Sequence, residues 1–296
     1  MPMLGTSRPP IIQPLEVPSA SHQGVQVYIK RDDLLDPVVS GNKLYKLKYN
    51  LEYAMDNGFD TIGTFGGAYS NHLHATAYAA KQCDLKTVAV IRGEQLLPLN
   101  PTIKDCVRWG MTIHPVSRIQ YKAKASSDFV AGLKQIYPNT YWIPEGGANQ
   151  LGVKGAQEIL DETEHYDFDV IVSACGTGTT LAGIINSAKS SQLVIGIPVL
   201  KGASWMHQEV ESWLINAGRA KWELWLDGHF GGYGKRSSEI DAFIKQMAEN
   251  HQLPLDKVYT AKALYLLIKK IDDGVFPAGS KILFCHTGGL QGMRET

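Results

Sequence analysis

The sequence predicts an α/β protein of two domains, each built on an open, mostly parallel, twisted sheet flanked by helices. The chain has 296 residues, 44% of them apolar, and about 150 residues per domain is the usual length, which favours two cores. Apolar segments typical of strands alternate with segments of helical periodicity along the whole chain. Most strand segments are apolar throughout, as in parallel sheets that helices cover on both faces.

The first half of the chain shows this alternation clearly. The helix from Lys43 places Leu44, Leu47 and Leu51 on one face, and Asn57-Gly58 is a typical helix stop. Strands are expected at 25–30, 61–67, 87–93, 111–116 and 141–147, and helices from Lys43, from Ser70, from Asn100-Pro101 and near 122–136.

The second half repeats the pattern. Its clearest strand is the apolar segment 170–174, which runs directly into a Gly-Thr turn. Further strands are expected at 193–200, 223–229 and 281–286, and helices from about 150, from Thr179, and near 204–217, 237–249 and 261–272.

Composition excludes several classes of function. The 29 basic and 29 acidic residues cancel, so no charge excess attracts nucleic acid or a membrane, and a small metabolite is the expected ligand. The four cysteines form no Cys-x-x-Cys pair, and no apolar segment reaches the roughly 20 residues of a membrane span. A cytoplasmic protein with reduced thiols is therefore expected. His72 and His74 lie two residues apart on a helix and face different ways, so no metal site is predicted.

Gly-rich turns mark the expected site, because ligands of parallel sheets bind where strands end and helices begin. The turn formed by Gly176, Thr177, Gly178, Thr179 and Thr180 follows a buried strand and opens a helix, so its N–H groups and hydroxyls suit a phosphate. It lacks the Lys of a nucleotide-binding P-loop and the spacing of a dinucleotide turn. A plain strand-to-helix turn is the alternative.

Two more turns carry candidate chemistry. Lys43 follows Ser40-Gly41-Asn42 at a helix start, where the helix N-terminus and Lys46 lower its pKa and favour Schiff-base formation, although a solvated surface lysine is the commoner case. After a double glycine, Ser70, Asn71 and His72 fall in the first turn of a helix and could cradle a substrate carboxylate. A simple Ser N-cap is the alternative there.

The order of these motifs carries a resemblance. The GNK lysine, GG-x-x-SN, EGG, GTGTT, Gly-Tyr-Gly, VYT and HTGG segments, from about Tyr28 to Gly289, resemble the pyridoxal-phosphate family of D-cysteine desulfhydrase and 1-aminocyclopropane-1-carboxylate (ACC) deaminase. The resemblance implies the tryptophan synthase β-like fold and a homodimer. It also implies a large cofactor-binding domain of residues 1–46 and 157–296 and a small domain of residues 47–156.

The resemblance also assigns roles to residues. Lys43 would carry the cofactor as a Schiff base, with Lys46 and the 176–180 turn on its phosphate and Asn71 near its phenolic oxygen. Ser70 and His72 would surround the substrate carboxylate, and family members usually carry Gln at the position of His72. Tyr233 and Tyr259 would face the substrate, although either could be a core aromatic. Thr260 and Thr287 would meet the pyridine nitrogen.

These last two positions direct the choice of substrate. ACC deaminases carry an acid and a leucine there, whereas D-cysteine desulfhydrases resemble this chain in carrying hydroxyls. An acid stabilises a long-lived carbanion, and a hydroxyl favours prompt loss of a leaving group. The sequence therefore favours α,β-elimination from D-cysteine or a similar D-amino acid, giving pyruvate, ammonia and sulfide, by a lyase or hydrolase. ACC deamination to 2-oxobutanoate and ammonia, and a cofactor-binding protein without turnover, are the alternatives.

Overall fold

Two sheets organise the chain in the computed structural model, which describes residues 10–93, 98–163, 166–215, 220–235 and 237–294. The strands of the larger sheet are, in spatial order, β1 (Ile12–Leu15), β2 (Gln26–Lys30), β10 (Lys281–Cys285), β7 (Val170–Cys175), β8 (Leu193–Pro198) and β9 (Lys221–Leu224). Those of the smaller sheet are β5 (Met111–Val116), β4 (Lys86–Arg92), β3 (Thr61–Gly66) and β6 (Thr140–Ile143). All neighbouring strands run parallel except β1, which pairs antiparallel with β2.

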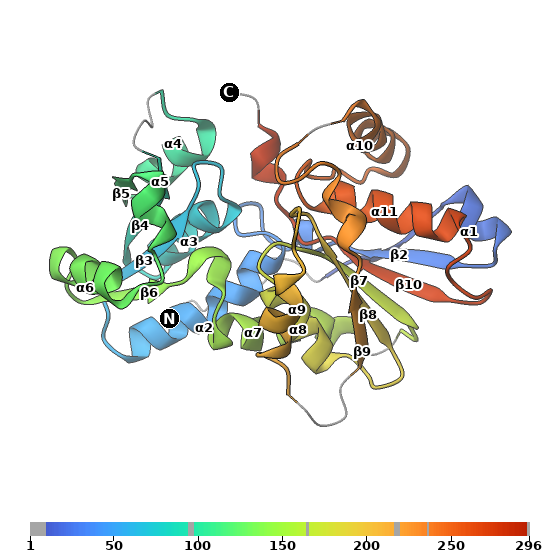
Figure 1. The fold of residues 1–296 in the computed structure, drawn as a ribbon, viewed down its shortest axis with the longest axis horizontal. Coiled ribbons are helices and arrows are strands. Elements are labelled where there is room, and N and C mark those ends of the chain that lie inside the picture. Colours follow the sequence, from blue (N-terminus) through green and yellow to red (C-terminus); the bar gives the residue numbers. More distant parts are fainter. Residues whose placement is uncertain (1–9, 94–97, 164–165, 216–219, 236, 295–296) are drawn as a thin grey trace.

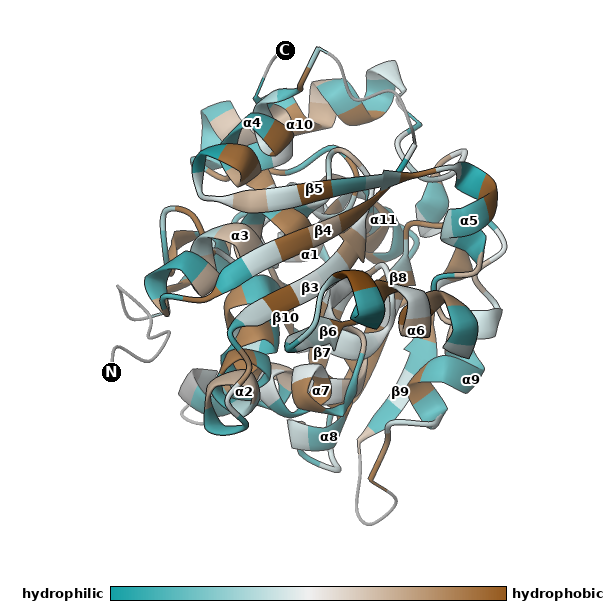
Figure 2. Cartoon of the chain, turned by 90° about the vertical axis from the view of Figure 1, so that its left-hand side faces the viewer, coloured by the Kyte–Doolittle hydropathy of each residue, from teal (hydrophilic) through white to brown (hydrophobic). Residues whose placement is uncertain are grey.

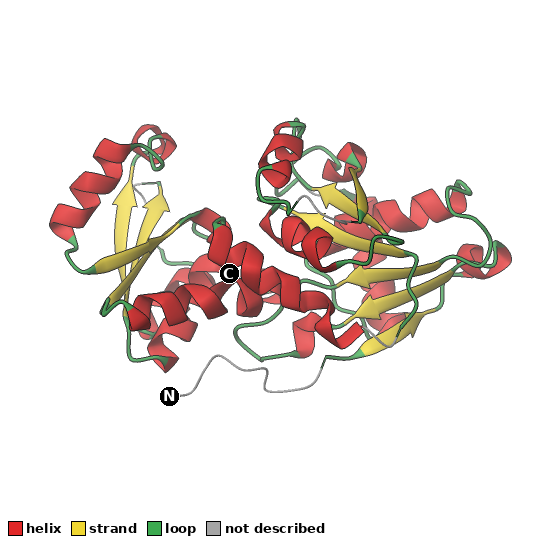
Figure 3. Ribbon diagram, turned by 90° about the horizontal axis from the view of Figure 1, so that it is seen from below, coloured by secondary structure: helices red, strands yellow, loops and turns green. Residues whose placement is uncertain are grey.

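Helices cover the sheets and separate them (Figures 1 and 3). Their bounds are α1 (Pro18–His22), α2 (Asn42–Asp56), α3 (Asn71–Gln82), α4 (Pro101–Arg108), α5 (Arg118–Lys122), α6 (Ser127–Ile136), α7 (Gln150–Gln157), α8 (Thr179–Ser187), α9 (Trp205–Glu211), α10 (Ser238–His251) and α11 (Thr260–Asp272). No helix in the described ranges is both long and apolar enough to span a membrane.

Strand β7 shows why the sequence forms a sheet buried on both faces. Its alternate side chains point to opposite faces, as strand geometry requires. Ile171 packs with α2, α7 and α8 on one face, whereas Val170 and Val172 pack with α10 and α11 on the other. Burying such a side chain fully contributes about 1.5–3 kcal/mol, so the unbroken apolar run specifies a central strand.

The smaller sheet follows the same rule. Ala89 and Ile91 of β4 pack against α3 and α4, while Val90 between them packs with Tyr121 of α5 and Leu133 of α6. Figure 2 shows the apolar middle of this sheet face on.

Glycines allow three helices to pack closely between the sheets. A Cβ on Gly155 of α7 would lie 1.9 Å from the carbonyl oxygen of Tyr45 in α2, and one on Gly183 of α8 would lie 2.4 Å from the Cβ of Ala156. These contacts connect the two sheets through α2, α7 and α8. The expected domain boundaries fall inside α2 and α7, so the division at 46/47 and 156/157 stays a prediction.

Several details of the predicted elements were wrong. The strand expected at 141–147 ends at Ile143, and Glu145–Gly147 form a 3₁₀ turn. The helix expected near 122–136 is two helices, because Ser117 caps α5 through the N–H of Gln120 and Ser126 caps α6 through the N–H of Phe129. The helix expected near 204–217 ends at Glu211, and residues 216–217 lie outside the described residues. Strand β9 begins at Lys221, and residues 226–229 form a 3₁₀ turn instead of continuing the expected strand.

Candidate functional site

The GTGTT turn connects β7 to α8 in a conformation suited to an anion. Gly178 precedes the helix with φ +79°, in the left-handed region that favours glycine, and no side chain caps the first N–H groups of α8. The hydroxyls of Thr177 and Thr179 lie 3.0 Å apart. Uncapped helix N–H groups beside two hydroxyls form a set of donors for a phosphate.

Lys43 lies directly beside this turn. Its Nζ donates to Oδ1 of Asn42 over 2.7 Å, and Nδ2 of Asn42 donates to Oγ1 of Thr180 over 2.8 Å. The start of α2 and the start of α8 are therefore joined by a side chain that sequence reasoning did not single out.

The surroundings of Lys43 make its amine more reactive than that of an exposed lysine. Burial lowers the pKa of its amine to about 8, although the carboxylate of Asp256 opposes the shift. An amine with this pKa is partly unprotonated near neutral pH and is a better nucleophile than an exposed lysine.

Lys46 lies one turn further along α2 and is 2% exposed. Burial and the nearby Lys43 lower the pKa of Lys46 well below its ordinary value, and within the described ranges no hydrogen bond or ion pair reaches its Nζ. A buried amine without a partner is costly. A phosphate would supply the missing acceptor, so Lys46 and the GTGTT turn fit the phosphate of pyridoxal phosphate, as the resemblance implies.

His72 lies next to Lys46, since a Cβ on Gly147 would touch Cε of Lys46 at 3.3 Å and Cε1 of His72 at 3.5 Å. Burial and the two lysines lower the pKa of His72 well below its ordinary value. The Thr64 hydroxyl donates to the carbonyl of Ile143, so Nε2 of His72 donates to Thr64 over 2.8 Å. Nδ1 is then a buried acceptor without a partner. In this state His72 cannot donate to a carboxylate, and its predicted substrate contact stays a prediction.

Ser70 and Asn71 open α3. Oγ of Ser70 accepts from the N–H of Leu73, so Ser70 is an N-cap. Oδ1 of Asn71 accepts from Nε2 of Gln291, and a Cβ on Gly289 would lie 2.9 Å from Nδ2 of Asn71. The GG-x-x-SN and HTGG segments, about 220 residues apart in sequence, are thus neighbours.

Tyr259 lies against the phosphate turn and Tyr233 lies against Tyr259. A Cβ on Gly176 would be 3.1 Å from the Tyr259 ring and 3.5 Å from its hydroxyl, and the two tyrosine rings are 6.1 Å apart at an angle of 73°. Burial, then the neighbouring Tyr233, raises the pKa of Tyr259 well above its ordinary value. Its hydroxyl is therefore protonated at neutral pH and able to donate.

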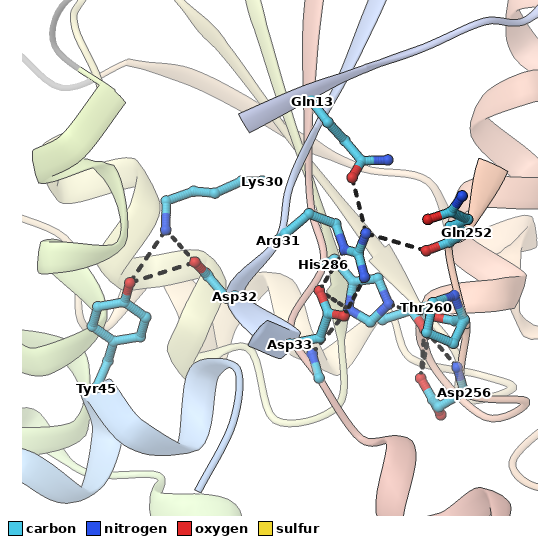
Figure 4. Close-up of polar contacts among 12 residues, drawn as sticks. Gln13, Lys30, Arg31, Asp32, Asp33, Tyr45, Gln252, Asp256, Thr260 and His286 are labelled. Atoms are coloured by element: carbon cyan, nitrogen blue, oxygen red, sulfur yellow. Dashed lines mark hydrogen bonds and ion pairs between the residues drawn. The ribbon is translucent and has the colours of Figure 1, made fainter. Parts of the chain in front are cut away.

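Asp256 is a buried carboxylate that sequence reasoning missed (Figure 4). Oδ1 accepts from the backbone N–H and the hydroxyl of Thr260 over 2.7 and 2.8 Å, and Oδ2 accepts from the N–H groups of Val258 and Tyr259, both over 2.9 Å. Its oxygens are saturated by the start of α11. The Asp immediately before the VYT motif is the signal that could have identified it, as a side chain able to cap the helix that follows.

Thr287 follows β10 and packs on the start of α2. The N–H of Asn42 donates to its carbonyl over 3.3 Å, and Gly41, at φ +65°, comes so close that a Cβ would lie 2.0 Å from that oxygen. His286 beside it is fully buried, with Nε2 donating to the carbonyl of Pro254 over 2.7 Å and Nδ1 accepting from the N–H of Gly288. The HTGG turn is thereby fixed to the loop that carries Asp256.

A buried charge network involves Lys30, Arg31, Asp32 and Asp33 (Figure 4). Arg31 and Asp33 form a two-point ion pair at 2.8 and 2.7 Å, and Nζ of Lys30 contacts Asp32 and the hydroxyl of Tyr45. The carbonyl of Asp32 accepts from the N–H of Gly41 over 2.8 Å. The network therefore ties strand β2 to the turn that presents Lys43.

Most predicted site residues thus lie near strand ends and helix starts, whereas Tyr233 lies in the loop between residues 226–229 and α10 and is 51% exposed. A reactive amine, a turn of anion donors beside Lys46, and the protonated hydroxyl of Tyr259 can hold an aldehyde cofactor by its phosphate and present acids and bases to a bound amine.

Comparison with known proteins agrees with this chemistry. The family described as "Pyridoxal-phosphate dependent enzyme" matches residues 7–288. The chain is 33% identical over 300 residues to the bifunctional D-cysteine desulfhydrase/1-aminocyclopropane-1-carboxylate deaminase, mitochondrial, of Arabidopsis thaliana, covering 92% of this chain and 74% of that protein. It is 30% identical over 292 residues to the D-cysteine desulfhydrase of Klebsiella pneumoniae (strain 342), covering 91% and 88%.

Solved structures confirm the predicted fold. A crystal structure of an ACC deaminase homologue superposes with a TM-score of 0.82 at 31% identity, covering 96% of this chain and 90% of that one. A fungal L-serine ammonia-lyase from Rhizomucor miehei shares the fold at 13% identity, with a TM-score of 0.66 over 97% of this chain and 94% of its own. The chain belongs to the pyridoxal-phosphate-dependent enzymes, in the family of ACC deaminase and D-cysteine desulfhydrase.

Proposed function

We propose that this enzyme catalyses α,β-elimination from D-cysteine, or from a D-amino acid with a similar β-leaving group, to give pyruvate, ammonia and sulfide. The proposal rests chiefly on Thr260 and Thr287, the two hydroxyl residues at the positions expected to meet the pyridine nitrogen. The Thr260 hydroxyl donates to Asp256, and this bond and three more from the start of α11 saturate that carboxylate. A hydroxyl environment favours prompt loss of a β-substituent over a long-lived carbanion.

Each predicted residue has a task in this reaction. Pyridoxal phosphate, when bound, supplies the electron sink for the bond broken at the α-carbon. Lys43 would hold the cofactor, Lys46 and the 176–180 turn would bind its phosphate, and Asn71 would meet its phenolic oxygen. The α-proton passes to the amine of Lys43, whose pKa of about 8 suits a base, or to Ser70.

The departing sulfur needs a proton donor. Tyr259 and Tyr233 face each other across 6.1 Å between their rings, and burial keeps Tyr259 protonated by raising its pKa. One of these hydroxyls donates to the leaving group. Ser70 and Asn71 bind the substrate carboxylate, and His72 lies beside it while its Nε2 donates to Thr64.

ACC deamination is the second candidate, because the Arabidopsis relative carries both activities in its name. Assays of the purified enzyme with each substrate separate the two. We expect pyruvate and sulfide from D-cysteine and little 2-oxobutanoate from ACC. Turnover of ACC alone would overturn the proposal, as would a cofactor absorbance that no amino acid changes.

A further inference from the structure

A basic hollow of about 420 Å³ opens at the end of the smaller sheet. Its described lining residues are Arg92, Arg118, Tyr121, Lys122, Lys124 and Glu145. These come from the end of β4, from α5 and the turn after it, and from the end of β6. Four cationic side chains therefore converge on one hollow with a single carboxylate, on a protein whose net charge is zero.

The positive charges are only partly neutralised. Lys124 pairs with Glu145 at 3.3 Å, and no carboxylate of the described segments lies within ion-pair distance of Arg92, Arg118 or Lys122. Arg92 and Lys124 instead lie over the ring of Tyr121, at 5.9 and 5.0 Å from its centre. Clustered cations repel each other, so an anion between them would relieve that repulsion.

Tyr121 adds an unused donor to the hollow. The residue is 3% exposed, and its buried hydroxyl has no hydrogen-bond partner in the part of the chain that the structure describes. Burial, the charge of the Glu145 carboxylate and a hydrogen-bonding interaction with it raise the pKa of Tyr121 above its ordinary value. Glu145 is therefore close to this phenol without a well-formed hydrogen bond to it, so an oxyanion in the hollow would be a better acceptor for the hydroxyl.

The hollow shares its walls with the cofactor site. Glu145 immediately precedes Gly146, where a Cβ would lie 3.0 Å from Cγ2 of Thr177 in the phosphate turn. A Cβ on Gly67, in the turn before Ser70, would lie 3.7 Å from a guanidinium nitrogen of Arg92. The Glu145 carboxylate is also close enough to raise the pKa of Tyr259.

We propose that this hollow is an anion subsite at the mouth of the active site, which takes a carboxylate, sulfonate or phosphate at the far end of the amino-acid substrate. The inference rests on the proposed function and adds to it a preference for D-amino acids that carry a second acidic group. Convergent arginines, lysines and a phenol recognise such groups by charge-assisted hydrogen bonds.

Paired ligands of equal size test the proposal. D-glutamate and D-glutamine differ in side-chain charge, and the change in the visible band of the holoenzyme reports the binding of each. We expect D-glutamate to bind about tenfold more tightly, the effect of one charge-assisted hydrogen bond. The double variant Arg92→Gln/Arg118→Gln, and separately Tyr121→Phe, should weaken D-glutamate binding and leave D-glutamine binding unchanged. Arg108→Gln, an exposed arginine on α4, is the matched control.

The outcomes separate the two claims. Equal affinity for D-glutamate and D-glutamine would overturn the anion subsite. So would an equal loss of D-glutamate affinity in Arg108→Gln and in the double variant. Either result would leave the proposed function standing. If no amino acid alters the band, the proposed function fails, and calorimetry of the holoenzyme with inorganic phosphate decides the subsite. A heat of phosphate binding that the parent and Arg108→Gln show and the double variant lacks would support the subsite. Equal heat in all three proteins would overturn it.

Discussion

Asn42 donates a hydrogen bond to Thr180, with 2.8 Å between Nδ2 and Oγ1, and so joins the helix that presents Lys43 to the turn that holds the phosphate. The same amide accepts from Nζ of Lys43 over 2.7 Å. The spacing between the reactive amine and the anion site is therefore set by one side chain, and the two features are neighbours although more than a hundred residues separate them in sequence.

Thr180→Val tests this connection. The substitution keeps the side-chain shape but removes the hydroxyl, so we expect the dissociation constant for pyridoxal phosphate to rise about tenfold. Thr76→Val is the matched control, because the Thr76 hydroxyl is buried without a partner. That variant should bind the cofactor normally and be at least as stable as the parent. Equal cofactor titrations for both variants would contradict the role given to Thr180.

Lys46→Met should affect stability and cofactor binding in opposite directions. Without cofactor, the Lys46 amine has no hydrogen-bond or ion-pair partner among the described residues, so its replacement by an apolar side chain of similar length should raise the free energy of unfolding by about 1–3 kcal/mol. Loss of the phosphate contact should weaken cofactor binding at least about tenfold. Denaturant unfolding of the apoenzyme and cofactor titration measure the two effects. A destabilised apoenzyme with unchanged cofactor affinity would show that Lys46 is only a packing residue.

Asp256→Asn should shift the pH at which the apoenzyme captures its cofactor. The Asp256 carboxylate favours the charged form of Lys43, whose pKa is about 8, while burial favours the neutral form. Removing the carboxylate charge therefore lowers the pKa of Lys43. In the parent enzyme, we expect the rate of cofactor capture to reach half its maximum near pH 8. In Asp256→Asn it should do so at a lower pH. Lys46 and His72 are the other titratable groups beside Lys43, and both favour its neutral form when charged. Asp272→Asn, at the far end of α11, is the control and should leave the pH dependence of cofactor capture unchanged. A shift to higher pH in Asp256→Asn would contradict the role given to the Asp256 carboxylate.

Lys262 holds the loop that carries Tyr233, and its removal should lower activity without direct contact to substrate. Its fully buried side chain donates to the carbonyls of His229 and Gly232 over 3.0 and 2.8 Å. We expect Lys262→Met to reduce kcat by about 100-fold or somewhat less, near the lower end of the roughly 10²–10⁴-fold that a positioned acid or base contributes. Adding Tyr233→Phe to this variant should cost little more, because both changes remove the same donor. Lys269→Met on the same helix is the control, and fully additive losses would show that Lys262 does not act through Tyr233.

Much of this architecture could be predicted because its signals are local in sequence. The apolar run of β7, the Ser70 cap and the Gly-Thr turn each specify a strand end or a helix start, and strand ends gather at one edge of a parallel sheet. The edge strand β1 and the break between α5 and α6 were missed, although Ser117 with Gln120 forms a capping box and Ser126 caps a second helix.

The contacts between distant segments could not be predicted in the same way. No spacing indicates that Asp256 saturates its carboxylate on α11, that Lys46 lacks a partner, or that Arg92 and Lys124 meet over Tyr121. Such features depend on how sheets and helices pack in three dimensions, and they decide the pKa values and the charge of the site.

The attachment point of the cofactor tests the central claim most directly. Reducing the holoenzyme with borohydride fixes the link between the lysine and pyridoxal phosphate, and peptide mass spectrometry identifies the modified residue. We expect the added mass on Lys43 and none on Lys46 or Lys48. Attachment to any other lysine, with Lys43 unmodified, would contradict the account.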